Sequence, residues 1–312
     1  MRKVEENLLT KGYSRGWTRT PWAIVLHYTA GYTEPQTHSV LKNRGISVHF
    51  CVERDGKLVR YLEDENRGWH AGSSSWCGYS GINHHAFGVE MVNFGWGDGE
   101  FDGSSPRYVY RNKGTPEVMQ SDKEFYRDER YKSSKGKLVT TRVVTAQDMD
   151  KFPDHRKAWS NKLWAEYPDQ QVEAVAWQVW NWMKEYNILP ENVIGHEHVS
   201  PTRKTDPGPA FPWNQLEIYL RARMVKEKPA LLDVNFNRKL RVRAVQSHCA
   251  RMGLNVGDID GWWGKKTEAA IKDAVKLYGK TYNIENLLID PDNLTNIAFA
   301  LKMIPGFDPG RR

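Results

Sequence analysis

Residues 22–28, Trp-Ala-Ile-Val-Leu-His-Tyr, restrict the fold more than any other part of the chain. The run is apolar at successive positions, which is typical of a strand buried on both faces of a sheet. It ends with His27 and Tyr28 and is followed by Thr-Ala-Gly. The sequence therefore predicts a central strand that delivers a histidine at its carboxyl end.

Three further short apolar runs supply neighbouring strands, at residues 46–52, 58–62 and 86–92. The Asp55-Gly56 pair between the first two predicts a hairpin turn. Residues 169–187 carry apolar side chains at helical spacing and predict an amphipathic helix, which Pro190 ends.

The pattern changes twice along the chain. Residues 97–160 are polar and lack clear periodicity, which indicates a long surface insertion. The pattern breaks again over residues 226–238, which we interpret as a linker between residues 1–225 and residues 239–312. The last segment shows three short helical stripes, and a chain of 312 residues is long enough for about two domains.

The net charge of +7, from 45 basic and 38 acidic residues, favours an anionic partner, although it is equally typical of simple solubility. No block of Lys and Arg with interleaved aromatic residues predicts nucleic-acid binding. No apolar run approaches the roughly 20 residues that span a bilayer. The first residues lack the apolar centre of a secretory signal.

The three cysteines are scattered, which disfavours a thiolate zinc site.

A Gly- and Pro-rich stretch reading GHEHVSPTRKTDPGPAFPW collects candidate metal ligands. A catalytic zinc site uses three protein ligands and leaves a position for water or substrate. His27, His196, His198 and Asp206 are the candidates, and no H-E-x-x-H helix motif competes with them. The alternative is that each histidine is a hydrogen-bonded structural residue, which is the commoner role for a lone histidine at a strand end.

Glu90 lies inside an otherwise apolar strand pattern. A buried carboxyl group is costly unless it is paired or functional, and burial raises its pKa toward the range of a general base. The alternative is that strand alternation points Glu90 to solvent while Val89 and Met91 face the core.

Two other histidines also have open roles. His49 alternates with Val48 and Phe50, and it could belong to the core or line a cleft. His70 follows Trp69 in a predicted loop, where a surface or binding role is favoured over a core role.

Five pieces of the chain resemble, in order, the zinc-dependent N-acetylmuramoyl-L-alanine amidases of the amidase-2 type, which include phage, cell-wall-recycling and animal recognition proteins. The resemblance implies an α/β fold, with a mixed central sheet flanked by helices. It also implies hydrolysis of the amide bond between N-acetylmuramic acid and L-alanine in peptidoglycan. The pieces are VLHYTAG (25–31), SVHFCVERDGKLVRYL (47–62), RGWHAG (67–72), FGVEMVN (87–93) and GHEHVSPTRKTDPGPAFPW (195–213).

The resemblance implies that His27, His196 and Asp206 bind Zn²⁺. His196 is preferred over His198 because the family's ligand directly follows a glycine, here Gly195. The phage lysozyme-like members use cysteine as the third ligand, so the chain resembles instead the branch with two histidines and an aspartate.

Further roles follow from the same resemblance. Glu90 corresponds to the acidic residue that handles the reacting water, and Lys204 to the basic residue that stabilises the oxyanion. We expect His70, His49 and Trp69 to contact substrate.

The C-terminal segment resembles the three-helix peptidoglycan-binding domain, through Gln246 and the stretch DIDGWWGKKT at 258–267. We therefore expect bacterial peptidoglycan as the partner, neither nucleic acid nor membrane, and a monomer. A phage endolysin made in the host cytoplasm and acting on the cell wall is favoured over a recycling amidase or a secreted effector. The alternatives are a non-catalytic peptidoglycan receptor and an enzyme that cuts another wall bond.

Overall fold

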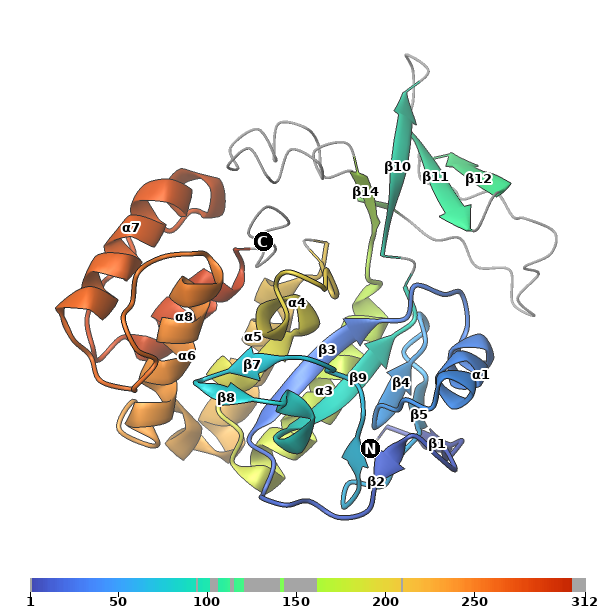
Figure 1. The fold of residues 1–312 in the computed structure, drawn as a ribbon, viewed down its shortest axis with the longest axis horizontal. Helices are drawn as coiled ribbons and strands as arrows, with labels where there is room; N and C mark the ends of the chain where they lie inside the picture. The colour runs from blue at the N-terminus through green and yellow to red at the C-terminus, as the bar shows by residue number, and fades with distance from the viewer. Residues whose placement is uncertain are drawn as a thin grey trace.

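The computed structural model describes residues 2–93, 95–101, 106–112, 115–120, 141–142, 162–208 and 210–304. Its centre is a six-stranded mixed sheet in the order β1-β5-β4-β9-β3-β15 (Figure 1). Strands β4, β9, β3 and β15 run parallel, and β5 pairs with β4 in antiparallel fashion. The strands are β1 (Val4–Glu6), β3 (Ala23–Tyr28), β4 (Phe50–Val52), β5 (Leu58–Arg60), β9 (Ala86–Met91) and β15 (Val193–Gly195). The predicted α/β fold with a mixed central sheet is confirmed.

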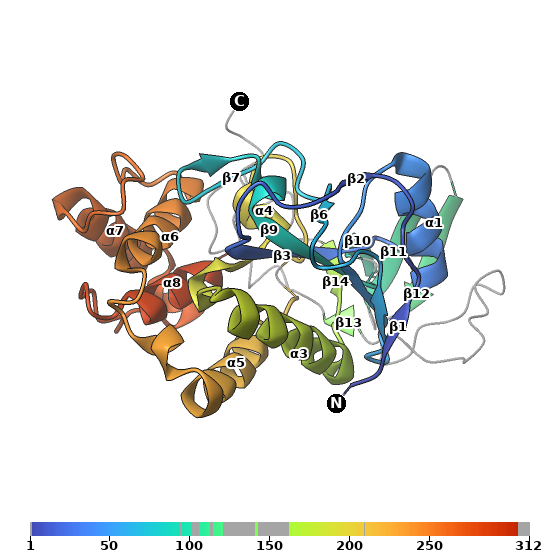
Figure 2. The ribbon, with the colours of Figure 1, turned by 90° about the horizontal axis from the view of Figure 1, so that it is seen from below.

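Helices α3 (Asp169–Tyr186) and α5 (Trp213–Glu227) lie together below the sheet in Figure 2. The main hydrophobic core lies between them and the sheet. It is built from strand residues such as Ile24, Leu26 and Phe87, which pack against helix residues such as Val175 and Leu220. The amphipathic helix predicted at 169–187 is confirmed, and it ends where Asn187 adopts a left-handed conformation with φ of 57°.

The opposite face of the sheet carries the site described below. Because side chains alternate along a strand, the burial of Ile24 and Leu26 toward α3 directs Ala23, Val25 and His27 to the other face. Short elements cover that face. They are β2 (Tyr13–Ser14), β6 (Arg67–Gly68), β7 (Ser75–Trp76), β8 (Tyr79–Ser80), η1 (Ile82–His84) and α4 (His196–Val199), with α1 (Glu34–Arg44) at the side of the sheet (Figure 1 and Figure 2). The short helix η4 (Pro190–Asn192) leads directly into β15.

The predicted hairpin joins β4 to β5. Glu53 N–H donates to the Lys57 carbonyl at 2.9 Å, and Gly56 adopts a φ of 83°. That φ lies in the left-handed region, and a Cβ on Gly56 would also lie only 2.5 Å from the Gln170 carbonyl oxygen. The turn therefore needs glycine for both conformation and space.

Much of the predicted insertion at 97–160 lies outside the described residues. The parts that are described form a second sheet in the order β12-β11-β10-β14-β13, which stands away from the central sheet in Figure 1. Its strands are β10 (Trp96–Phe101), β11 (Pro106–Asn112), β12 (Thr115–Gln120), β13 (Thr141–Arg142) and β14 (Lys162–Ala165). Antiparallel pairing joins each strand to its neighbour.

The C-terminal segment is helical. Its three predicted stripes form the helices α6 (Arg238–Arg251), α7 (Lys265–Tyr282) and α8 (Leu294–Lys302), which share a second hydrophobic core. Before them, residues 226–238 contain the end of α5 and the short helix η5 (Pro229–Leu232), in which Leu231 is buried in the main core. The domain boundaries at 225 and 239 stay a prediction. No helix in the described part of the chain combines the length and the apolar character that crossing a membrane requires.

Candidate metal centre

Three neighbouring parallel strands bring polar residues to one place. His27 on β3 is paired in register with Glu90 on β9, so both side chains leave the sheet on the same face. On the other side of β3, Gly195 of β15 pairs with Leu26, and His196 follows it directly. The carboxyl ends of parallel strands are the usual position of a site in an open α/β sheet.

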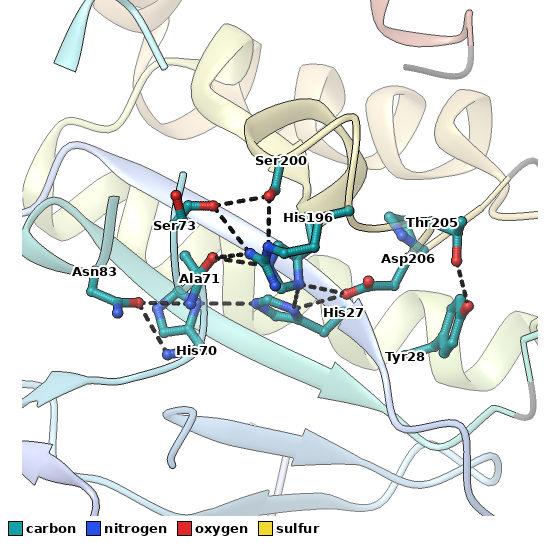
Figure 3. A network of polar contacts seen from close by, with 12 residues as sticks. His27, Tyr28, His70, Ala71, Ser73, Asn83, His196, Ser200, Thr205 and Asp206 are labelled. Atoms are coloured by element: carbon teal, nitrogen blue, oxygen red, sulfur yellow. Dashed lines mark hydrogen bonds and ion pairs between the residues drawn. The ribbon is translucent and has the colours of Figure 1, made fainter. Parts of the chain in front are cut away.

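His27, His196 and Asp206 converge on a single point (Figure 3). The Nδ1 atoms of the two histidines lie 2.9 Å apart, and each lies 2.9 Å from Asp206 Oδ2. All three side chains are buried, at 2%, 2% and 7% exposure. The three atoms form an equilateral triangle in the interior of the protein.

The loop that carries Asp206 is held against the end of β15. The Glu197 N–H donates to the Asp206 carbonyl at 2.8 Å. A Cβ on Gly195 would lie 2.5 Å from Pro207 Cδ, so only glycine allows this approach. Tyr28 and Thr205 join their hydroxyl groups at 2.7 Å and hold the other side of the loop.

The hydrogen bonds of His196 fix which of its ring nitrogens carries a proton. Its Nε2 lies 3.0 Å from the Ala71 carbonyl, which can only accept, so Nε2–H is the donor. The neutral ring therefore presents a bare lone pair at Nδ1. Arg203 reinforces this side by donating to the carbonyls of Ala71 and Ser73 at 2.8 and 3.1 Å, and to Ser200 Oγ at 3.1 Å.

A cation fits this arrangement. Two ring nitrogens and a carboxylate oxygen face one another, and a single shared proton can bridge only two of the three. Burial, and then the electrostatic interaction with the neighbouring His196, lowers the pKa of His27 to about 4, which keeps the His27 imidazole neutral and able to coordinate. Two imidazole nitrogens with one carboxylate oxygen form a donor set suited to zinc.

Glu90 stands beside the triangle. It is half-buried, and its Oε2 atom is buried with no hydrogen-bond partner in the described part of the chain. Burial, and then the charge of Asp206, raises the pKa of Glu90 to about 8, while Lys204 works in the opposite direction. Val89 and Met91 face the core as alternation requires, but the face that Glu90 shares with His27 is the site and not open solvent.

The second histidine of the HEH stretch points elsewhere. His198 accepts a hydrogen bond at Nδ1 from the Gly195 N–H at 3.0 Å, and its ring stacks on Trp213. The residues that come together as a possible metal site are therefore His27, His196 and Asp206, without His198.

The residues predicted to contact substrate have different surroundings. Trp69 is 43% exposed. His49 is fully buried, and both of its ring nitrogens are used by backbone groups, because Nε2 donates to the Asn66 carbonyl and Nδ1 accepts from the Gly88 N–H. His70 is half-buried, with its Nδ1 3.0 Å from His27 Nε2. Substrate contact by these residues stays a prediction.

Several residues that support the site were not predicted from the sequence. Arg203 lies within the ligand stretch and its basic side chain could have been considered, but nothing in the pattern shows that it faces the Ala71 carbonyl. Asn83 accepts from the N–H groups of His70 and Ala71 at 3.0 and 2.7 Å, and it has no sequence signal of its own.

A protein-family model described as N-acetylmuramoyl-L-alanine amidase matches residues 17–209, which include every residue of the triangle and Glu90. The chain is 24% identical over 200 residues to the N-acetylmuramoyl-L-alanine amidase AmiD of Escherichia coli K12, which is 62% of this chain and 51% of AmiD. It is 24% identical over 201 residues to the 1,6-anhydro-N-acetylmuramyl-L-alanine amidase AmpD of the same organism, which is 64% of this chain and 72% of AmpD. The match thus spans about half the length of AmiD.

Among solved structures, the chain resembles AmiD from E. coli in complex with the substrate anhydro-N-acetylmuramic acid-L-Ala-D-gamma-Glu-L-Lys. The TM-score is 0.44 at 18% identity, over 92% of this chain and 90% of that one.

Proposed function

The chain belongs to the family of N-acetylmuramoyl-L-alanine amidases, whose model it matches over residues 17–209, and on that premise we propose that it is a zinc-dependent hydrolase of peptidoglycan. The bond cut is the amide between the lactyl group of N-acetylmuramic acid and the L-alanine of the stem peptide. The observation that carries the proposal is the convergence of His27, His196 and Asp206 beside Glu90, inside the matched segment.

His27 Nδ1, His196 Nδ1 and Asp206 Oδ2 would hold the metal. A bound zinc ion supplies Lewis acidity, which polarises the scissile carbonyl group and lowers the pKa of a water molecule toward neutrality. The chain's own contribution is to bury the ligands, keep their lone pairs free of protons and hold them in one geometry.

Glu90 would accept the proton of the attacking water and pass it to the leaving amine. A general base works best when its pKa lies near the working pH. Burial moves the pKa of Glu90 in that direction, and none of the described residues forms a hydrogen bond with its Oε2 atom. Lys204 follows the turn that begins at Ser200, and its charge acts on both Glu90 and His27. It would stabilise the oxyanion that forms on the scissile carbonyl group.

The C-terminal helices would bind the wall polymer. Gln246 of α6 organises the loop at 258–267, which resembles the peptidoglycan-binding domain. Its side-chain N–H groups donate to Asp260 Oδ1 and Thr267 Oγ1, and its side-chain oxygen accepts from the Gly261 N–H. This loop presents Trp262 at 69% exposure, with Lys239 Nζ 5.5 Å from the ring centroid. An exposed indole beside a lysine suits a sugar polymer that carries negative charge.

The biological role that we favour is that of an endolysin, a bacteriolytic and hence antimicrobial enzyme. It would be made in the cytoplasm of a host cell and act as a monomer on the cell wall. The positive net charge is consistent with an anionic wall as the partner, with no role for nucleic acid or membrane.

Digestion of purified peptidoglycan tests the proposal. The zinc-loaded protein should release new L-alanine amino termini without new reducing sugars, and a chelator should stop the release. The Asp206→Asn variant is the matched control and should release none. New reducing ends would instead indicate a glycosidase, and retained binding to the wall without any release would indicate a receptor; either result would refute the proposal.

A further inference from the structure

His70 forms a bridge between the sheet backbone and a ligand of the metal triangle. Its Nε2 lies 3.1 Å from the Ala86 carbonyl, and its Nδ1 lies 3.0 Å from His27 Nε2. The rings of His70 and His27 meet edge to face, with centroids 5.1 Å apart and an interplanar angle of 84° (Figure 3). Three groups therefore lie in a row, from the Ala86 carbonyl through His70 to His27.

The chemistry of the first group fixes the protons of the others. A carbonyl oxygen only accepts, so His70 must carry its proton on Nε2 to make this contact. In neutral His70, Nδ1 is then a bare acceptor, and His27 must donate to it from Nε2. In neutral His27, that leaves Nδ1 without a proton, and Nδ1 is the atom that faces His196 and Asp206.

The fold holds the His70 ring in this position. A Cβ on Gly88 would lie 2.8 Å from the Cγ and Cδ2 atoms of His70, so the ring occupies the space that the glycine leaves open on β9. The His70 N–H donates to Asn83 Oδ1 at 3.0 Å and anchors the backbone. The nearby His49 uses both ring nitrogens in hydrogen bonds with backbone groups, at Asn66 and Gly88. Of His49 and His70, only His70 therefore contacts a residue of the metal triangle.

We propose that His70 is a positioning residue, which sets the tautomer and orientation of His27 so that His27 Nδ1 is free to bind the metal. The proposal rests on the metal site of the proposed function and gives His70 a role that does not require substrate contact. Partners that fix a ligand histidine in this way typically contribute 10–100-fold to metal affinity.

Two variants of nearly equal size separate this role from a merely structural one. In His70→Asn, Oδ1 can accept from His27 Nε2–H in place of Nδ1, whereas His70→Leu offers no acceptor. The measurement is the Zn²⁺ dissociation constant of the full-length protein, by competition with a chromophoric chelator. We expect His70→Leu to weaken zinc binding about 10–100-fold and His70→Asn to stay within about threefold of wild type. The exposed His84 supplies the control, because His84→Asn should leave zinc affinity unchanged.

Three outcomes would overturn the proposal. Equal losses of zinc affinity in both variants would indicate that His70 only fills space. Unchanged zinc affinity in both, with a raised KM, would indicate a substrate contact. The third outcome comes from ¹⁵N-detected NMR of the histidine rings in the metal-free protein, where we expect the Nε2–H tautomer of His27, and the Nδ1–H tautomer would contradict us. The NMR result does not depend on activity or on zinc, so it stays decisive even if the proposed function fails.

Discussion

Two buried polar clusters, each with a pair of histidines, differ in how the lone pairs of their histidines are satisfied. One is the metal triangle of His27, His196 and Asp206. The other lies where the end of the central sheet meets α6 and α8, and we call it the helical seam. Its members come from η4, α4 and the two C-terminal helices, and they are Glu191, His198, Arg241, His248, Arg251, Thr295 and Lys302.

The helical seam carries its own cations and donors. Arg241 forms a buried ion pair with Glu191, whose Oε1 also accepts from Thr295 Oγ1 at 2.6 Å. The Nδ1 lone pairs of its histidines each accept an N–H group, from Gly195 for His198 and from Arg251 Nε for His248. In the metal triangle, the corresponding Nδ1 atoms meet, among the residues that the structure describes, only each other and a carboxylate oxygen. Burial of histidines and carboxylates therefore does not by itself indicate a metal site. What indicates one is a set of nitrogen and oxygen lone pairs that point at one another with no N–H or O–H group of the described residues between them.

The largest expected effect comes from removing the anionic member of the triangle. Asp206→Asn replaces the charged ligand by a neutral amide, so zinc affinity should fall at least about 100-fold and amidase activity should be lost. Glu191→Gln makes the same chemical change in the helical seam and should leave the zinc dissociation constant unchanged. Calorimetric zinc titration of both variants measures this contrast, and equal losses would mean that the two clusters do not differ as described.

The next effect concerns the catalytic step alone. Glu90→Gln keeps the shape of the side chain but removes its ability to take a proton, so kcat should fall about 10²–10⁴-fold while zinc stays bound. Metal content by mass spectrometry and the rate of L-alanine release measure the two quantities separately. Full activity in this variant would remove Glu90 from the mechanism.

Within the helical seam, a single change should affect stability and not chemistry. Arg241→Met leaves Glu191 buried without its cation, so the free energy of unfolding should fall by about 3–5 kcal/mol. The double variant Arg241→Met/Glu191→Leu removes both charges and should recover most of that loss. Denaturant unfolding of the metal-free proteins measures both values. A double variant as unstable as the single one would contradict the claim that the two charges balance each other.

The smallest effect is a pH dependence at Lys302. Burial lowers the pKa of Lys302 to about 8, so its charge costs stability below that pH. Between about pH 8 and the unfolded value near 10.4, the folded protein loses this proton first, and stability should rise with pH. Lys302→Met lacks this titration. The advantage of the variant over wild type should therefore shrink by up to about 3 kcal/mol from pH 7 to pH 10.5, as followed by chemical unfolding. If the difference in unfolding free energy between Lys302→Met and wild type does not change with pH, the lowered pKa of Lys302 is refuted.

The two clusters also differ in how far the sequence reveals them. From the residues alone, the sequence offered His27, His196, His198 and Asp206 as candidate ligands, and only the resemblance to the amidase family selected His27, His196 and Asp206 from them. Strand alternation placed Glu90 on the face away from Val89 and Met91, but it could not show that His27 and its partners converge on this face and that it is not open to solvent.

The helical seam could not be predicted in the same way. Arg241, His248 and Lys302 lie off the apolar stripes of their helices, where a polar residue normally indicates a solvated face. Arg241 and Lys302 are buried against Glu191 and Pro190, and His248 against Trp76 and His198, all of which lie more than 40 residues away in the chain. The role that we propose for His70 could not be predicted for a related reason: the position of its ring and backbone is set by Gly88 and Asn83, which belong to other segments.

X-ray diffraction from zinc-soaked crystals at the zinc absorption edge tests the central claim most directly. We predict one strong anomalous peak within about 2.0–2.2 Å of His27 Nδ1, His196 Nδ1 and Asp206 Oδ2, and none at the helical seam. A zinc peak at the seam, or no zinc between the three triangle atoms, would contradict the claim that convergent lone pairs mark the metal centre.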